Sequence, residues 1–261
     1  MINLEVNMSG HSFLSEYMRE YKNDYILIGG NACVLNFKHV GVEFRATSDL
    51  DIVLVIEKDN PAFYEHLCNY LITNEYKGGL YSCVNKQGGS YRFLLPKSKK
   101  GSGLPEQIEL FSKKPDYFDP EKSKSLHITP IETADGISNF SAILMDELVY
   151  DFVIANKIEL DNISTVNLQC LIGLKSIAWN SNEKLHQSGF VKWSDVVKHA
   201  GDIVRISTII EDGDYVYPDS IYDSLQESKE KFILGDIAKD IPDVSDDIPV
   251  AIDFISTHVK K

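Results

Sequence analysis

The sequence predicts an α/β protein: a small mixed β-sheet flanked by helices, followed by a mainly helical C-terminal region. Three observations support this class. Short apolar runs alternate with helical patterns in the first half of the chain, and from residue 146 the pattern is almost wholly helical. The 261 residues are 43% apolar and 25% charged, which is ordinary for a chain with a sizeable core. We expect two domains, residues 1–125 for the α/β core and 126–261 for the helical part.

The first half reads as alternating helices and strands. Apolar residues at three- and four-residue intervals indicate helices, and short apolar runs bounded by Gly or Pro indicate strands. The expected order is a helix at 11–21, a strand at 25–28, a Gly-Gly turn and helix to 37, a strand at 49–56, a helix at 61–74, a hairpin of 80–85 and 90–95, a loop at 96–105, a strand at 107–112 and a connector at 113–124.

The second half opens on one strand and continues as helices. A strand is expected at 138–145, helices at 146–153, 168–180, 191–210 and 221–237, an acidic proline-interrupted stretch at 236–249, and a closing helix at 250–260.

The charge balance narrows the class of partner. With 26 Lys and Arg against 39 Asp and Glu, the net charge is −13. The summed field repels phosphate, which disfavours a nucleic-acid coat or a binder of anionic membranes but leaves room for a local basic patch. No run is long enough to span a membrane, no secretory signal pattern opens the chain, and four scattered cysteines suit reduced thiols. We therefore expect a cytoplasmic protein with no membrane partner.

Two aspartates open the strand at 49–56. Asp49 and Asp51 are two positions apart, so in a strand they share one face while Leu50 points the other way. Paired carboxylates repel each other, and a divalent cation relieves that repulsion. Oxygen ligands suit Mg²⁺, with Mn²⁺ as the alternative. Glu109, flanked by apolar residues in a later strand, is the candidate third ligand; a surface charge on an edge strand is the competing interpretation.

A glycine pair precedes this motif. Gly29 and Gly30 end a strand and lead into a helix, which turns backbone N–H groups and the positive helix end toward a phosphate tail. Three further candidates for nucleotide contact stand just before Asp49, namely Arg45, Thr47 and Ser48. A salt bridge for Arg45, and capping of the turn by Thr47 and Ser48, remain open alternatives.

Together these motifs resemble the nucleotidyltransferase superfamily that includes DNA polymerase beta, and most closely the AbiEii/AbiGii-type toxin nucleotidyltransferases. The shared signature is a Gly-Gly or Gly-Ser turn, a helix, an Asp-x-Asp strand and a third acid, here Gly29-Gly30, Asp49-x-Asp51 and Glu109. The third acid of the family is commonly Asp, so Glu109 is a departure. The resemblance covers about residues 25–205.

The same resemblance extends into the helical half. It implies that Lys175, in an otherwise apolar helix, binds nucleotide phosphates, and that Asp202 handles the nucleotide or acts as a base, with Lys198 at i, i−4 beside it. His199 stands where many relatives have Asp. A snorkelling Lys175, and a surface ion pair between Lys198 and Asp202, are the alternatives.

The function expected from this resemblance is metal-dependent transfer of a nucleoside monophosphate from a nucleoside triphosphate to an acceptor. The resemblance implies an RNA end such as that of tRNA, or a protein hydroxyl, as the acceptor. It also implies the toxin of a toxin–antitoxin or phage-defence pair, with an antitoxin as partner. The alternatives are a catalytically silent nucleotide-binding relative and a nucleotidyltransferase for small molecules such as antibiotics. A metal-dependent phosphohydrolase ranks last, because the histidines form no His-Asp cluster.

Overall fold

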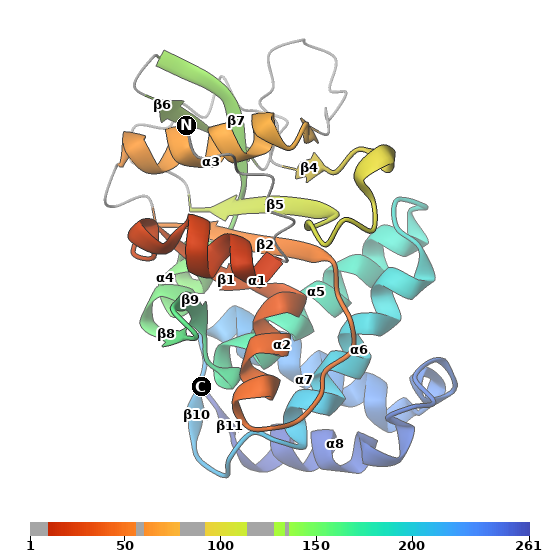
Figure 1. The fold of residues 1–261 in the computed structure, drawn as a ribbon. Helices are drawn as coiled ribbons and strands as arrows, with labels where there is room; N and C mark the ends of the chain where they lie inside the picture. Colours follow the sequence, from red (N-terminus) through yellow and green to blue (C-terminus); the bar gives the residue numbers. More distant parts are fainter. Residues whose placement is uncertain (1–9, 56–59, 79–91, 114–127, 134–135) are drawn as a thin grey trace. The chain divides into compact units, whose positions relative to one another are not determined.

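A computed structural model describes residues 10–55, 60–78, 92–113, 128–133 and 136–261 of the chain (Figure 1). It divides the chain into two compact units. Unit 1 comprises Met1–Tyr150 and Lys157–Val166, and unit 2 comprises Asp151–Asn156 and Asn167–Lys261. Unit 1 is built on a mixed β-sheet and unit 2 is mainly helical, so the predicted α/β class with a helical C-terminal region is confirmed.

The sheet of unit 1 has nine strands, of which seven form a continuous path. The path runs β3 (Lys77–Gly78), β4 (Arg92–Leu94), β5 (Gln107–Ser112), β2 (Asp49–Leu54), β1 (Tyr25–Ile28), β9 (Ile163–Val166) and β8 (Lys157–Leu160). Off this path, β7 (Gly136–Leu144) pairs with the end of β5 and with β6 (Ile128–Thr133). Parallel and antiparallel pairs alternate irregularly across the sheet, which makes it a mixed sheet.

The centre of the sheet is β1, β2 and β5, three strands that the sequence predicts at these residues. All four residues of β1 are buried, and in β2 the buried and half-buried residues alternate up to Ile52. β1 and β2 are antiparallel, with Ile28 opposite Asp51, while β2 and β5 are parallel. A parallel pair needs a long crossover connection. Helix α3 (Pro61–Thr73), close to its predicted bounds, lies in that connection.

The N-terminal helical segment is less regular than predicted. Residues expected to form one helix fold into three short pieces: α1 (Gly10–Ser12), a π-helical turn at Phe13–Tyr17 and a 3₁₀ turn at Arg19–Tyr21. Phe13 is fully buried and its ring packs 3.9 Å, centroid to centroid, from that of Tyr70 on α3. Such aromatic packing stabilises a segment whose own helix is short.

Strands β8 and β9 were not predicted, and they move the domain boundary. The expected division between residues 125 and 126 is wrong for the sheet, because β7, β8 and β9 all belong to unit 1. β9 is buried throughout and pairs in parallel with β1 at Leu27 and Thr165, whose hydroxyl donates to the Leu27 carbonyl over 2.9 Å. Four-residue strands are too short for a periodic pattern, which explains the omission.

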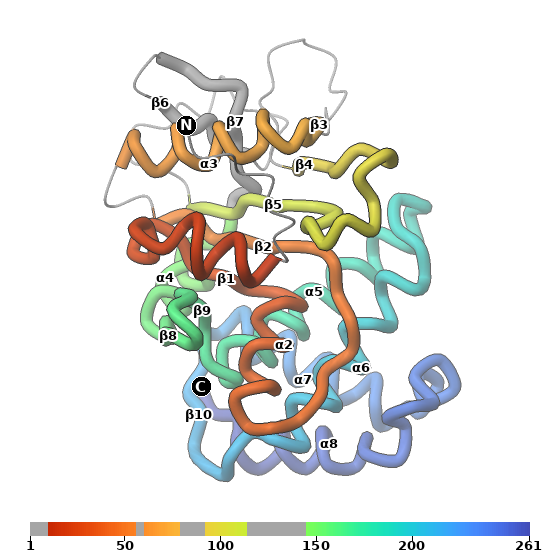
Figure 2. The backbone as a smooth tube through the Cα atoms, viewed as in Figure 1, coloured from red at the N-terminus to blue at the C-terminus, as the bar shows by residue number. Residues whose placement is uncertain are grey.

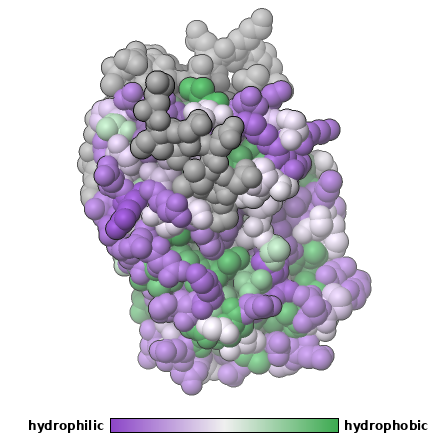
Figure 3. Space-filling model, viewed as in Figure 1, coloured by the Kyte–Doolittle hydropathy of each residue, from purple (hydrophilic) through white to green (hydrophobic). Residues whose placement is uncertain are grey.

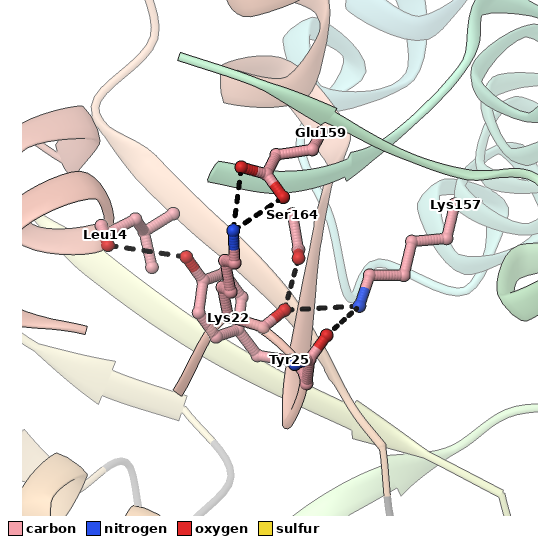
Figure 4. A network of polar contacts seen from close by, with 7 residues as sticks. Leu14, Lys22, Tyr25, Lys157, Glu159 and Ser164 are labelled. Carbon is pink, nitrogen blue, oxygen red and sulfur yellow. Dashed lines mark hydrogen bonds and ion pairs between the residues drawn. The ribbon is translucent and has the colours of Figure 1, made fainter. Parts of the chain in front are cut away.

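Polar contacts fasten the β8–β9 hairpin to the segment before β1 (Figure 4). Lys22 Nζ lies 2.9 Å from both carboxylate oxygens of Glu159 on β8. The Lys22 carbonyl accepts hydrogen bonds from Ser164 Oγ and, over 3.2 Å, from Lys157 Nζ. The Tyr25 hydroxyl donates to the Leu14 carbonyl over 3.4 Å. This network holds the hairpin at its place in the sheet.

Unit 2 confirms the predicted run of helices. Its helices are α5 (Leu168–Gln187), α6 (Trp193–Ser207), α7 (Asp219–Leu234) and α8 (Ile248–Thr257), with a two-stranded parallel pair, β10 (Tyr215–Val216) and β11 (Val259–Lys260). Helix α4 (Glu147–Ala155) starts in unit 1, and its residues from 151 belong to unit 2. The acidic stretch forms 3₁₀ turns at Asp236–Asp240 and Ser245–Asp247. Trp179 on α5, buried against Phe232 on α7, centres the helical core.

Two sequence expectations fall outside the described parts of the chain. Most of the predicted hairpin at 80–85 and 90–95 lies there, as does the connector from residue 114 to 124. Of the hairpin only β4 is described, and it pairs with β3 and β5.

None of the helices that the structure describes is both long and apolar enough to cross a membrane. On the face drawn in Figure 3, hydrophilic residues are interspersed with smaller hydrophobic areas.

Candidate active site

The two predicted metal-binding aspartates lie at the start of β2 with their side chains on one face. Leu50 between them is fully buried on the opposite face, whereas Asp49 and Asp51 are half-buried. Ser48 Oγ donates to Asp49 Oδ1 over 3.2 Å, and the Ser48 carbonyl accepts the backbone N–H of Glu106 over 2.9 Å. The strand that carries both carboxylates is therefore tied to the start of β5.

The glycine pair lies directly against this motif. Helix α2 (Gly29–His39) begins at Gly29 itself, so the separate turn predicted before the helix is absent. Gly29 has φ +73°, and a Cβ there would lie 2.7 Å from Asp51 Cγ and closer still to Oδ2. A Cβ on Gly30 would lie 2.7 Å from Thr47 Oγ1. Glycine is favoured at Gly29 by both its φ and the approach of Asp51, and at Gly30 a Cβ would oblige the Thr47 side chain to move.

The start of α2 has no side-chain cap. Its capping residue, Ile28, has no side-chain acceptor, and the first turn contains no acidic residue. Figure 2 shows the chain leaving β1 into α2 and returning to β2. Ile28 is in register with Asp51, and Asn31 in the first turn of α2 bonds to the Asp49 carbonyl, so the helix start and the two aspartates are neighbours. First-turn N–H groups and the helix dipole favour negative charge at this point.

Asn31 is a site residue that sequence reasoning missed. It is 8% exposed, and its Nδ2 donates to the Asp49 carbonyl over 2.6 Å, which joins the first turn of α2 to the first residue of β2. His11 Nε2 lies 3.2 Å from the Asn31 carbonyl. Burial lowers the pKa of His11, while the hydrogen bond to Asn31 partly opposes that shift. The only sequence signal was a polar residue among small and apolar ones after the glycines.

Glu109 lies in register with Asp51, yet it has a different partner. The parallel pairing of β2 and β5 places Glu109 opposite Asp51, and the pairing of β4 and β5 places Arg92 opposite Glu109. Arg92 Nε donates to Glu109 Oε1 in an ion pair. Within the described ranges, no three or more His, Cys, Asp or Glu side chains are grouped so that they could hold a metal ion. The expected three-carboxylate site is therefore not assembled in this structure.

Arg45 and Thr47 lie on the segment that leads into β2. The Arg45 guanidinium lies 5.4 Å from the centroid of the Phe44 ring, which is a cation–π contact. Thr47 packs on Gly30. Of the predicted nucleotide-binding residues in unit 1, the structure thus brings Gly29, Gly30, Thr47 and Ser48 to the aspartates.

In unit 2, Lys175 and Asp202 form a buried ion pair. Lys175 Nζ on α5 lies 2.8 Å from Asp202 Oδ2 on α6, and the two side chains are 4% and 0% exposed. Arg205 Nη1 lies 3.7 Å from the other carboxylate oxygen. A cation in an otherwise apolar helix needs an anionic partner, and Asp202 is that partner for Lys175.

The alternative of a surface ion pair between Lys198 and Asp202 is not found: each residue pairs with another side chain. Lys198 Nζ lies 3.3 Å from Asp195 Oδ1 at i, i−3, whereas Asp202 turns toward α5. His199 Nε2 lies 3.1 Å from Asn182 Nδ2. Short-range ion pairs of this kind on a helix contribute little to stability, so Lys198 is a partly exposed surface residue here.

Comparisons of the chain with protein-family models, with curated proteins and with solved structures find no match. A function for this chain is therefore argued from the residues around Asp49 and Asp51.

Proposed function

We propose that the chain is a metal-dependent nucleotidyltransferase, which moves a nucleoside monophosphate from a nucleoside triphosphate to an acceptor hydroxyl. One observation carries the proposal: the Asp51 carboxylate packs on Gly29 at the start of α2, which no side chain caps, with Asp49 beside it on the same strand face. Carboxylates for a cation and backbone N–H groups for a phosphate are then adjacent, as transfer at phosphorus requires.

The residues present fit a divalent cation held by two carboxylates. Asp49 and Asp51 are half-buried and point to one side of β2. Mg²⁺ is usually bound by one or two carboxylates, with substrate phosphates and water completing its shell. When bound there, Mg²⁺, or Mn²⁺ in its place, would neutralise charge on the phosphates.

The chain's own residues account for binding and orientation. Gly29 and Gly30 let a triphosphate approach the backbone at the start of α2. Asn31 and Ser48 hold Asp49 through its carbonyl and its carboxylate. Glu109, one strand further along the same row, would align the acceptor hydroxyl, whose oxygen attacks the α-phosphorus as pyrophosphate leaves. Positioning and charge neutralisation supply the catalysis, without a covalent enzyme intermediate.

Lys175, Lys198 and Asp202 are not part of this proposal. Each has an ion-pair partner of its own within unit 2, and the Lys175–Asp202 pair is almost completely buried. A buried pair that lost one partner to a ligand would leave an uncompensated charge in the protein interior.

The net charge bears on the acceptor. A chain of −13 repels a long polyanion, which favours a protein hydroxyl or a small molecule over an extended RNA. A tRNA end, and an antitoxin as protein partner, rest on the resemblance to AbiEii-type toxins alone.

The test is transfer of label from each α-³²P nucleoside triphosphate in the presence of Mg²⁺, with total RNA and total cell protein as acceptors. We expect label on one class of macromolecule, reduced at least about 100-fold in Asp49→Asn and Asp51→Asn, since a lost transition-state contact costs that much. Asp161→Asn is the matched control, because it removes an exposed carboxylate paired with Lys38. Label that survives both site variants would refute the proposal, and γ-³²P triphosphate distinguishes phosphoryl transfer.

The second candidate is a nucleotide-binding relative without turnover. The ion pair of Glu109 with Arg92 favours it, because it leaves only two carboxylates for a cation. Triphosphate binding that depends on Asp49 and Asp51 but yields no product on RNA, protein or small-molecule acceptors would support this second candidate.

A further inference from the structure

A row of charged side chains crosses three adjacent strands of the sheet. Asp51 on β2 is in register with Glu109 on β5, and Glu109 is in register with Arg92 on β4. Residues in register on neighbouring strands have side chains on the same face, and neighbouring strands are about 4.8 Å apart. The order along the row is therefore carboxylate, carboxylate, guanidinium.

The two ends of the Arg92–Glu109 ion pair differ in exposure. The Glu109 side chain is 13% exposed and the Arg92 side chain is 44% exposed. A carboxylate so nearly buried needs a counter-ion, because desolvation disfavours the isolated charge. The guanidinium, in contrast, keeps almost half of its surface in solvent, where a dissolved anion can reach it.

Resting on the proposed function, we propose that Arg92 is an exchangeable counter-ion for Glu109 that senses the nucleotide. An anionic phosphate oxygen of a bound triphosphate takes the guanidinium, which binds phosphate in the same forked geometry as carboxylate. Glu109 then loses its guanidinium partner, and a divalent ion bound at Asp51, the residue in register with Glu109 on β2, would replace it. The site accordingly changes from two carboxylates to three when substrate enters.

This exchange makes Arg92 a positioning residue for Glu109. In the absence of nucleotide, Arg92 and a divalent cation compete for the same carboxylate. In the absence of metal, Glu109 and a triphosphate compete for the same guanidinium. Removal of the Arg92 charge should therefore strengthen metal binding and weaken nucleotide binding, and removal of the Glu109 charge should do the reverse. If the ion pair were merely structural, either change would weaken both metal binding and nucleotide binding.

The first measurement is Mn²⁺ binding without nucleotide, followed by the paramagnetic resonance signal of free Mn²⁺. Arg92→Met removes the charge and keeps the side-chain stem. We expect it to bind Mn²⁺ about tenfold more tightly than the wild-type chain, the factor that matches one charge-assisted hydrogen bond of about 1.4 kcal/mol. In the Glu109→Gln background, Arg92→Met should give no gain. Lys22→Met, which removes the cation from the Lys22–Glu159 pair, is the control and should change nothing.

The second measurement is triphosphate binding in EDTA by calorimetry, with ATP and the other common triphosphates as probes. Arg92→Met should weaken binding about tenfold, and Glu109→Gln should strengthen it, because the phosphate no longer competes with the Glu109 carboxylate for the guanidinium. Should Arg92→Met not fold, Arg92→Lys keeps a cation without the fork, and its Mn²⁺ affinity should lie above that of the wild type.

The outcomes separate this inference from the proposed function. If Asp49→Asn and Asp51→Asn bind Mn²⁺ as tightly as the wild-type chain does, the proposed function is overturned, and the inference with it. Mn²⁺ binding that depends on both aspartates but is unchanged or weakened in the Arg92 variant overturns the inference alone. Weakened triphosphate binding in both Arg92→Met and Glu109→Gln also overturns it, because that is the result of a structural pair.

Discussion

Replacement of Gly29 by alanine tests whether the glycine pair exists to accommodate Asp51. Gly29 has φ +73°, a conformation that costs a non-glycine residue about 1–2 kcal/mol. The added Cβ would also lie 2.7 Å from Asp51 Cγ and 3.0 Å from Asp51 Cβ. Contacts under 3.0 Å force the carboxylate out of its rotamer, which costs about 0.5–1.5 kcal/mol more. The free energy of unfolding should therefore fall by about 2–3 kcal/mol.

Gly41→Ala is the matched control for this change. Gly41 has φ +75°, and a Cβ there would meet no atom within 4 Å, so the variant isolates the backbone cost. Urea unfolding followed by far-UV circular dichroism compares the two variants. The expected difference, about 1 kcal/mol, belongs to the contact with Asp51. In the Asp51→Ala background most of that difference should vanish, because the clashing carboxylate is gone.

Activity gives a second measure of the same contact. A displacement of about 1 Å in a positioning group can lower a rate about 100-fold. Gly29→Ala should therefore lower the rate of nucleotidyl transfer about 100-fold, whereas Gly41→Ala should leave that rate unchanged. If the two alanine variants proved equally stable and equally active, Asp51 would not lie against Gly29 and the argument for the site would lose its main support.

Three further predictions concern buried or half-buried groups. Asp202→Asn should lower the free energy of unfolding in urea by about 3–5 kcal/mol, because it leaves the buried Lys175 cation without its partner. Lys175→Met combined with Asp202→Leu should recover most of that loss. Equal losses in the single and the double variant would contradict a coupled pair. Burial lowers the pKa of His11, so its neutral form is favoured in the folded chain, and stability should fall as pH drops below about 6.5, where the unfolded chain takes up the proton. His11→Gln should flatten this fall between pH 7 and pH 5. An unchanged pH profile in that variant would refute the role of His11. Burial raises the pKa of Cys68 to about 11, so about one thiol in a thousand is ionised at pH 8, and alkylation of Cys68 followed by peptide mapping should be far slower in the folded chain than in urea; equal rates in both states would exclude the shift.

Local patterns predicted the elements that carry the candidate site. The apolar run before Gly29, the alternation from Asp49 onward and the strand around Glu109 each match β1, β2 and β5 closely. The side-chain period of a strand is two whatever its neighbours are, so the common face of Asp49 and Asp51 follows from their spacing alone.

The partners of the charged residues could not be derived in this way. Arg92 pairs with Glu109 because β4 and β5 are in register, and Lys175 pairs with Asp202 because α5 packs on α6. A local sequence pattern predicts neither strand register nor helix packing, because both depend on which surfaces meet in three dimensions. Sequence patterns therefore could not show that Glu109 and Lys175 have ion-pair partners within the chain.

The sequence by itself determined the α/β class, the order of most helices and strands and the shared face of the two aspartates, because period, turn residues and spacing act within a few residues. Only the tertiary structure decided that β8 and β9 complete the sheet of unit 1, that Gly29 makes room for Asp51, and that Asn31 holds the Asp49 carbonyl. These features arise from contacts between segments distant in the chain, where burial and hydrogen bonding select among partners that the local sequence leaves equally available.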